Sequence, residues 1–191
     1  MENHDDIERS IAERIKHLRQ QRNLTLDQLA STSGVSRAMI SRIERAEASP
    51  TAALLARICA AFGLSLSGFF AQDEVAASPL VKRQDQATWQ DPDTGYIRRA
   101  ISPPLNGYDV DIVEVEFPPY AKVTFPPHTA SRGMVQYVWL LEGALEMTTG
   151  GEVHQMGPGD CLFMPVGEGH MFHNPSDTSA RYAVVLDQRK R

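Results

Sequence analysis

The chain has 191 residues with 24 acidic and 19 basic side chains, a formal net charge of -5. This length exceeds that of one small domain, so we expect two compact units and a sizeable core. No apolar stretch approaches the ~20 residues of a bilayer span, and the acidic start MENHDDIER lacks the basic region of a signal peptide. We therefore expect a soluble, cytoplasmic protein with no membrane partner.

The charge is unevenly distributed along the chain. Residues 9–46 carry eight basic and three acidic side chains, whereas residues 47–191 carry 11 basic and 17 acidic ones. A compact basic segment on an acidic protein indicates a local face for a polyanion, although a solvated helix face would look the same. The two cysteines, Cys59 and Cys161, sit in apolar runs far apart, which predicts buried, reduced thiols.

The first part of the chain has helical periodicity. Apolar residues recur at three- or four-residue steps from residue 7 to about 70. Helix starts are predicted at hydroxyl residues that can cap a first turn: Thr25, with Gln28 completing a capping box, Ser36, Ser49 before Pro50, and Ser65. With Gly34 in a short turn, this pattern predicts about five helices.

One stretch of this region, LTLDQLASTSGVSRAMISRIERAEASPT at residues 24–51, is similar to the helix-turn-helix of phage-repressor-like (XRE family) regulators. The match rests on these residues: Leu29, Ala30, Gly34, Val35, Ser36, Ile40, Ser41, Ile43 and Glu44. The resemblance covers about residues 9–70 and implies an all-α, five-helix lambda-repressor-like domain that binds double-stranded DNA. Leu26 and Ala46 depart from the family pattern, which affects the expected backbone contacts rather than the fold.

The helix after Ser36 has an apolar side and a short, polar, cationic side. Arginine on such a helix can read guanine edges in a major groove. Carried over by position, the resemblance puts four residues near bases: Arg37, Ala38, Ser41 and Arg42. It puts three more at phosphates, namely Thr25, Ser36 and Arg45. Glu44 faces away and is expected to tie helices together.

The pattern changes after residue 71. We expect domains at residues 1–71 and 80–191, joined by a linker at 72–79. Beyond the linker, alternating segments predict closely spaced strands and hence an all-β barrel or sandwich. These segments lie at residues 109–117, 135–141, 144–149, 161–165 and 181–186.

The stretch GDCLFMPVGEGHMFHN, residues 159–174, resembles the second motif of the cupins, with Gly159, Pro165, Gly167, His170 and Asn174 in register. The resemblance implies a cupin (double-stranded β-helix, jelly-roll) barrel. The predicted fold class is therefore α+β as two domains, an all-α domain followed by an all-β one.

Cupin enzymes hold a metal with histidines and a glutamate from a first motif. Here that stretch is HTASRGMVQYVWLLEG at residues 128–143, which puts Gln136 in the glutamate position and has no histidine in register. His128 lies one or two residues early, so the weak alternative metal set is His128, Gln136 and His170. A neutral amide is a poor ligand for a divalent ion, so we predict no metal cofactor.

The remaining polar groups suit an organic ligand. We predict that His128, Arg132, Gln136 and His170 bind a small effector, an amino acid or another carboxylate. Val138, Phe172 and Met134 would form an apolar wall, whereas Tyr137 and Trp139 fall on the opposite strand face, in a core or an interface. Of the adjacent Arg98 and Arg99, one must face each side of the sheet, and an inward one would be a second anion anchor.

The domain order resembles that of bacterial transcription regulators whose barrel senses a metabolite and which act as homodimers. This is the predicted function, and the protein is not expected to be an enzyme. Two alternatives stay open: a mononuclear-metal cupin enzyme of the epoxidase or oxygenase type with a helix-turn-helix appendage, and a DNA binder whose barrel only dimerises.

Overall fold

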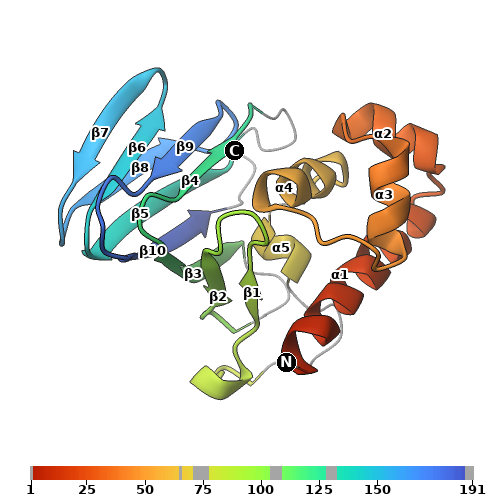
Figure 1. Cartoon of the computed structure of the whole chain (residues 1–191), viewed down its shortest axis with the longest axis horizontal. Helices are drawn as coiled ribbons and strands as arrows, with labels where there is room; N and C mark the ends of the chain where they lie inside the picture. Colours follow the sequence, from red (N-terminus) through yellow and green to blue (C-terminus); the bar gives the residue numbers. More distant parts are fainter. Residues whose placement is uncertain (1, 65, 71–77, 104–108, 128–132, 188–191) are drawn as a thin grey trace.

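The computed structural model describes residues 2–64, 66–70, 78–103, 109–127 and 133–187. Its helical half is followed by a two-sheet barrel, in agreement with the predicted two-domain α+β class (Figure 1). The helices are α1 (Glu2–Gln21), α2 (Leu26–Ser33), α3 (Arg37–Glu44), α4 (Ala52–Ala61) and α5 (Leu66–Phe70). Among the described residues, no helix combines the length and apolar character needed to cross a bilayer.

Side-chain caps define the starts of the central helices. The Thr25 hydroxyl accepts from the Gln28 backbone N–H and the Gln28 side chain accepts from the Thr25 N–H, which confirms the predicted capping box. The Ser36 hydroxyl accepts from the Met39 N–H at 3.2 Å. The prediction that Ser49 and Pro50 open the next helix was wrong by two residues, because Thr51 caps α4 by accepting from the Leu54 N–H.

The strands form two antiparallel sheets. The six-stranded sheet has the order β1-β2-β3-β10-β5-β8, and the four-stranded sheet has the order β4-β9-β6-β7. The bounds are β1 (Thr88–Gln90), β2 (Ile97–Ala100), β3 (Val110–Phe117), β4 (Lys122–Phe125), β5 (Val135–Glu142), β6 (Leu145–Thr149), β7 (Glu152–Met156), β8 (Cys161–Pro165), β9 (His170–His173) and β10 (Ala180–Asp187). A short 3-10 helix, η1 (Arg83–Asp85), precedes β1.

Alternation along β5 separates an inner and an outer face of the larger sheet. Val138 and Leu140 are fully buried, whereas Tyr137 and Trp139 are 45% and 49% exposed, as the sequence pattern predicts. Cys161 pairs with Trp139 and is exposed on the same outer face. The prediction of two buried cysteines was therefore wrong for Cys161 and right for Cys59, because an apolar run does not show which strand face a given residue takes.

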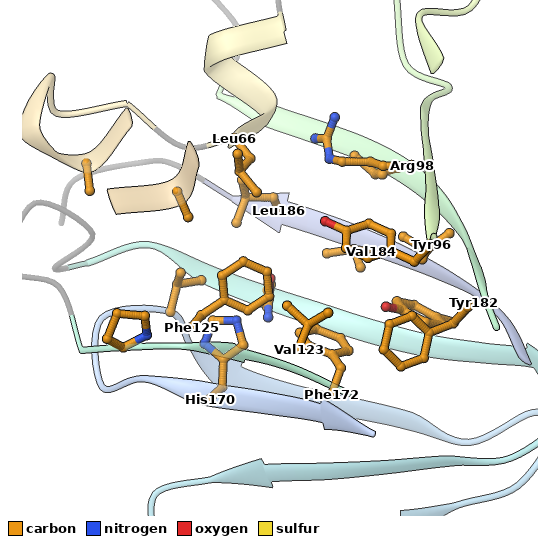
Figure 2. A pocket seen from close by; sticks show the side chains of 18 of the residues that line it. Leu66, Tyr96, Arg98, Val123, Phe125, His170, Phe172, Tyr182, Val184 and Leu186 are labelled. Carbon is orange, nitrogen blue, oxygen red and sulfur yellow. The ribbon is translucent and has the colours of Figure 1, made fainter. Parts of the chain in front are cut away.

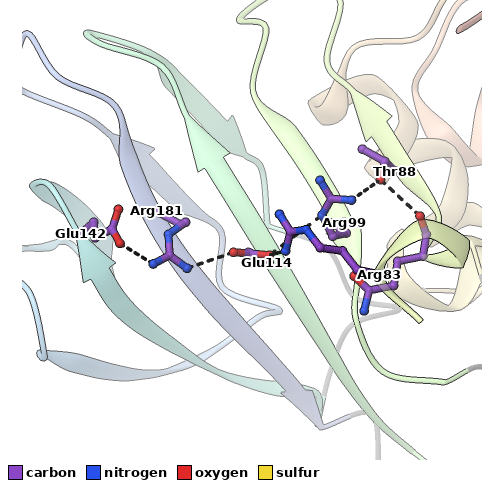
Figure 3. A network of polar contacts seen from close by, with 7 residues as sticks. Arg83, Thr88, Arg99, Glu114, Glu142 and Arg181 are labelled. Carbon is purple, nitrogen blue, oxygen red and sulfur yellow. Dashed lines mark hydrogen bonds and ion pairs between the residues drawn. The ribbon is translucent and has the colours of Figure 1, made fainter. Parts of the chain in front are cut away.

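A polar network crosses the outer face of the six-stranded sheet (Figure 3). The Arg181 guanidinium donates to Glu114 Oε1 at 3.0 Å and also to Glu142, which links β3, β10 and β5. Arg99 lies 3.9 Å from Glu114 and donates to the Thr88 hydroxyl. The adjacent Arg98 is buried, so the two arginines of β2 face opposite sides, as predicted.

The helical half is packed directly against the barrel through α4 and α5, which lie between the sheets and the other helices (Figure 1). The Phe70 ring lies 5.9 Å from the Trp89 ring and 5.3 Å from the Arg98 guanidinium. The buried Asp91 carboxylate of the β1–β2 turn accepts from the Ala52 N–H, at the first turn of α4, at 2.6 Å. The most deeply buried apolar side chains of both halves therefore form one continuous core.

Candidate nucleic-acid interface and effector cavity

Helix α3 presents one side to the core and the other to solvent. Ile40 and Ile43 are buried, and Val35 packs beside them in the turn before the helix. The predicted DNA-contacting residues Thr25, Ser36, Arg37, Ala38, Arg42 and Arg45 are exposed, and Ser41 is half-buried. Six of the side chains that the sequence assigns to DNA therefore lie on α3 and its two caps, and the seventh, Thr25, caps the start of α2.

The three arginines of this surface are not equivalent. Arg45 donates to both carboxylate oxygens of Glu47, each at 2.7 Å, and to the Ser41 hydroxyl. The Glu47 carboxylate raises the pKa of Arg45, and Arg45 lowers the pKa of Glu47, through the same hydrogen bonds. Arg37 lies 3.3 Å from Asp27, whereas Arg42 has a long 3.5 Å contact with the Glu47 carbonyl. Arg42 is thus the arginine that can reach a base without leaving a carboxylate.

The orientation of α3 is held by a charged pair with α1. Arg19 donates from Nε to Glu44 Oε1 at 2.7 Å and from Nη2 to Glu44 Oε2 at 2.8 Å. These side chains are 15% and 7% exposed, and Arg19 also donates to the Leu24 carbonyl. The expected role of Glu44 as a tie between helices is confirmed.

A cavity of about 140 Å³ lies between the two sheets and is covered on one side by α4, by Leu64 and by the first residue of α5. Its walls are mostly aliphatic and aromatic, and Figure 2 shows Arg98 and Leu66 across the cavity from His170 and Phe125. From the barrel it is lined by Tyr96, Arg98, Val113, Val115, Phe117, Val123, Phe125, Pro126, Gln136, Val166, His170, Phe172, Tyr182, Val184 and Leu186. From the helical half it is lined by Ala56, Arg57, Ala60, Leu64 and Leu66.

The cavity includes two of the predicted ligand-binding residues. His170 stacks on Phe125 at 5.0 Å between ring centroids, and burial lowers the pKa of the imidazole to about 4. The ring is therefore neutral near pH 7, and its buried Nδ1 has no hydrogen-bond partner among the described residues. The Gln136 amide is 6% exposed and contacts the Met164 sulfur at 3.4 Å.

Two arginines, Arg57 and Arg98, are also among the residues that line the cavity. Arg98 is 6% exposed, and burial lowers its pKa, an effect that the negative charge of Asp111 partly offsets. Arg57 reaches from α4 and donates to the Ser33 carbonyl at 3.1 Å and to the Gly34 carbonyl. Arginine stays protonated in proteins, so both are cations. The described lining contains no aspartate or glutamate.

Sequence reasoning identified only part of this site. His128 and Arg132 lie outside the described residues. Phe172 lines the cavity as predicted, whereas Val138 and Met134 are buried in the core without lining it. The contributions of β3 and β10 could have been inferred from their inward alternation, but nothing in the local pattern around Arg57 indicates contact with a barrel.

The cupin fold raises the question of a metal, and the described residues do not fit one. Among them no group of three His, Cys, Asp or Glu side chains converges on a point. Besides the His170 imidazole, the described lining offers the Gln136 amide and no carboxylate, and Arg57 and Arg98 are also among its residues. Cation repulsion and a weak amide donor both disfavour a divalent ion.

Comparison with known proteins agrees with this geometry. Residues 15–69 match the family described as Helix-turn-helix, and residues 113–186 match the family described as Cupin domain. The HTH-type transcriptional regulator SutR of Escherichia coli (strain K12) is 25% identical over 186 residues, covering 95% of this chain and 97% of that protein. The HTH-type transcriptional regulator PuuR of the same organism is 26% identical over 163 residues, covering 85% of this chain and 86% of that protein.

A solved structure extends the similarity to the whole architecture. The crystal structure of an HTH_3 family transcriptional regulator from Vibrio cholerae superposes with a TM-score of 0.79 at 26% identity, covering 96% of this chain and 97% of that one. The chain therefore has an XRE-type helix-turn-helix domain followed by a cupin domain. Its similarity to HTH-type regulators extends over nearly the full length of both proteins.

Proposed function

We propose that this protein is a DNA-binding transcription regulator whose cupin barrel binds a small organic effector that modulates DNA binding. The observation that carries the proposal is the presence, in one chain, of an exposed cationic helix-turn-helix surface and a mostly apolar cavity between the sheets. The full-length similarity to HTH-type transcriptional regulators supports it. Since a bacterial chromosome lies in the cytoplasm, this function implies a cytoplasmic location.

On the DNA side, α3 would enter the major groove with its first turns. Base contacts are assigned to Arg37, Ala38, Ser41 and Arg42, and phosphate contacts to Thr25, Ser36 and Arg45. Arg42 is the strongest candidate for base reading because its guanidinium is exposed and is not held by a carboxylate. Arg45 would first have to leave Glu47.

For the effector, the cavity favours a compact monocarboxylate with an apolar body. A cavity of about 150 Å³ holds benzene, so 140 Å³ suits a single ring or a short branched chain. The guanidinium of Arg57 can pair with a carboxylate, while neutral His170 and the Gln136 amide offer hydrogen bonds. Without an acidic group in the described lining, an ammonium group would have no counter-charge, so simple carboxylates are favoured over amino acids.

The active form would be a homodimer, because a two-fold pair of recognition helices matches two half-sites. An apolar row runs across the outer face of four neighbouring strands, in which Ile112 pairs with Val185, Val185 with Tyr137, and Tyr137 with Phe163; all but the half-buried Val185 are exposed. Trp139 lies beside this row, and the Glu114–Arg181–Glu142 network borders it (Figure 3). An apolar centre with a polar rim is the anatomy of a subunit interface, and a second copy of this face is self-complementary.

We favour binding over catalysis in the barrel. An enzyme of the epoxidase or oxygenase type needs a metal site, and the described residues supply one imidazole and one amide. The polar groups of the cavity are suited to recognition, and neutral His170 has no neighbouring carboxylate in the described lining to act with it as an acid–base pair.

The test is selection of genomic DNA fragments by the purified protein, followed by affinity measurement at increasing salt. Specific fragments with a steep salt dependence are expected, since phosphate contacts release counterions. Arg42→Ala should weaken specific binding by about 1 to 3 kcal/mol, whereas Arg83→Ala, an exposed arginine of the barrel, should not. Absence of any preferred fragment, together with stoichiometric metal and turnover, would contradict the proposal.

The dimer is tested separately by light scattering. Trp139→Glu places a charge in the exposed apolar face and should give a monomer, whereas Val153→Glu, an exposed position of β7 in the other sheet, should not. If the Trp139→Glu protein is still a dimer, the subunit interface does not lie on this face.

A further inference from the structure

The effector cavity is not enclosed by the barrel alone. Helix α4 of the DNA-binding domain packs against β4 and contributes Ala56, Arg57 and Ala60 to the lining. Any molecule that fills the space between the sheets therefore meets a helix of the DNA-binding domain. No separate relay is needed to bring the two domains into contact with the same ligand.

Helix α4 is also fixed at a second point on the barrel and at one point on the helix-turn-helix. Asp91 of the barrel accepts from the Ala52 N–H at the first turn of α4. On the other side, Arg57 donates to the carbonyls of Ser33 and Gly34, which form the turn between α2 and α3. Gly34 has φ 65°, and a Cβ there would lie 2.6 Å from Arg57 Nη2, so the guanidinium fits closely against the turn.

From these contacts we infer that Arg57 is the coupling residue of the regulator, and that filling the cavity acts on DNA binding directly through α4 and the α2–α3 turn. This inference rests on the proposed function and deepens it. An anionic ligand in the cavity attracts the Arg57 guanidinium, whose donors otherwise hold the turn carbonyls. A bound anion in the cavity thus weakens the hydrogen bonds from Arg57 to the α2–α3 turn, and this turn orients α3.

The geometry also explains how a small ligand has a large effect. Packed helices respond to a filled cavity by shifting as rigid bodies, because side chains in a close-packed core cannot be compressed. A shift of α4 on the barrel must either carry the turn with it through Arg57 or break the two bonds to the turn. In both cases the position of α3 relative to a second recognition helix changes.

The decisive experiment fills the cavity without a ligand. Val184→Phe adds an aromatic ring from the barrel side, and Val166→Phe is an alternative from another wall. The matched control is Val153→Phe, an exposed valine on β7 of the other sheet, away from both the cavity and the proposed dimer face. We expect the cavity variants, but not the control, to change the affinity for a selected DNA fragment by about 5-fold to 150-fold, the usual range of coupling between sites.

A double variant distinguishes coupling through Arg57 from a general disturbance of the fold by the larger side chain. In an Arg57→Gln background, Val184→Phe should change DNA affinity by less than about twofold, because the link to the turn is gone. If the full effect of Val184→Phe persists without Arg57, or if folded Val184→Phe and Val166→Phe bind DNA like the wild type, the inference is wrong.

Hydrogen exchange provides a readout that does not depend on DNA. The Gly34 and Val35 amides, which donate to Ala30 and to the Ser33 hydroxyl, should exchange at a different rate in the cavity variants. If the wild type selects no DNA but amide exchange changes in the cavity variants, the proposed function is wrong, and the coupling of the cavity to the α2–α3 turn through Arg57 is supported. If the wild type selects DNA but the cavity variants change neither DNA affinity nor amide exchange, the inference about Arg57 is wrong and the proposed function is kept.

Benzoate serves as the chemical probe of the same link. At millimolar concentration it should raise the melting temperature of the wild type and alter exchange at the α2–α3 turn, and benzylamine should do neither. Melting and turn exchange that are both unchanged by benzoate would contradict a role for Arg57 as the group that senses an anion.

Discussion

Replacing Asn174 tests how the barrel holds the loop that follows β9. Asn174 is fully buried, and its amide nitrogen donates to the carbonyls of Phe117, Pro118 and Thr178 at 3.3, 3.0 and 2.7 Å. Its oxygen accepts from the N–H and hydroxyl of Ser176. The side chain thus joins the end of β3 to the loop after β9.

The nearly isosteric Asn174→Asp variant keeps the acceptor and removes the donor. Two good donated bonds are lost, at about 1 to 1.5 kcal/mol each, and an oxygen then faces carbonyl groups without a hydrogen between them. We expect a loss of about 3 kcal/mol in the free energy of unfolding at pH 7. Ser176→Ala removes one hydroxyl bond and should cost about 1 kcal/mol.

The assay is urea unfolding followed by tryptophan fluorescence. Both tryptophans, Trp89 and Trp139, lie on barrel strands, so the signal reports the domain that contains Asn174. The midpoint should fall while the slope with urea stays the same, since the exposed surface does not change. If Asn174→Asp costs no more than Ser176→Ala, the donated bonds do not hold the loop and the argument is refuted.

Three further predictions follow from the charged groups. Glu47→Ala frees Arg45 and should steepen the salt dependence of DNA affinity by about 0.9 in log–log slope, measured by fluorescence anisotropy; an unchanged slope would remove Arg45 from the phosphate contacts. Glu44→Gln leaves Arg19 charged and largely buried, and should lower helical-domain stability by about 3 kcal/mol in circular dichroism, more than Asp27→Asn at an exposed pair. For His170, with a folded pKa of about 4 against about 6.5 unfolded, the unfolded chain binds the proton first, so stability should fall by up to about 3 kcal/mol between pH 6.5 and 4. His170→Gln should abolish that part of the pH dependence. If the variant and the wild type lose the same free energy of unfolding between pH 6.5 and 4, groups other than His170 cause the loss.

The sequence by itself determined the two domains and the surface of the recognition helix. The capping box at Thr25, the left-handed glycine at position 34 and the alternation of β5 are local effects, set by residues within a few positions of one another. For the same reason the motif spacing predicted that His170 and Gln136 belong to one site in the barrel, and both line the cavity. It did not show which strand face Cys161 takes, since β8 is short and apolar on both sides.

Only the tertiary structure decided what surrounds these residues. Arg45 is held by Glu47, Arg98 faces inward, and Arg57 of a helix in the first domain lines a cavity in the second. Each of these facts depends on how separate segments pack, and packing between residues far apart in the chain leaves no periodic signal in either segment. The sequence therefore predicts a helix-turn-helix and a barrel, and the fold shows that one helix, α4, both lines the cavity and holds the turn before α3.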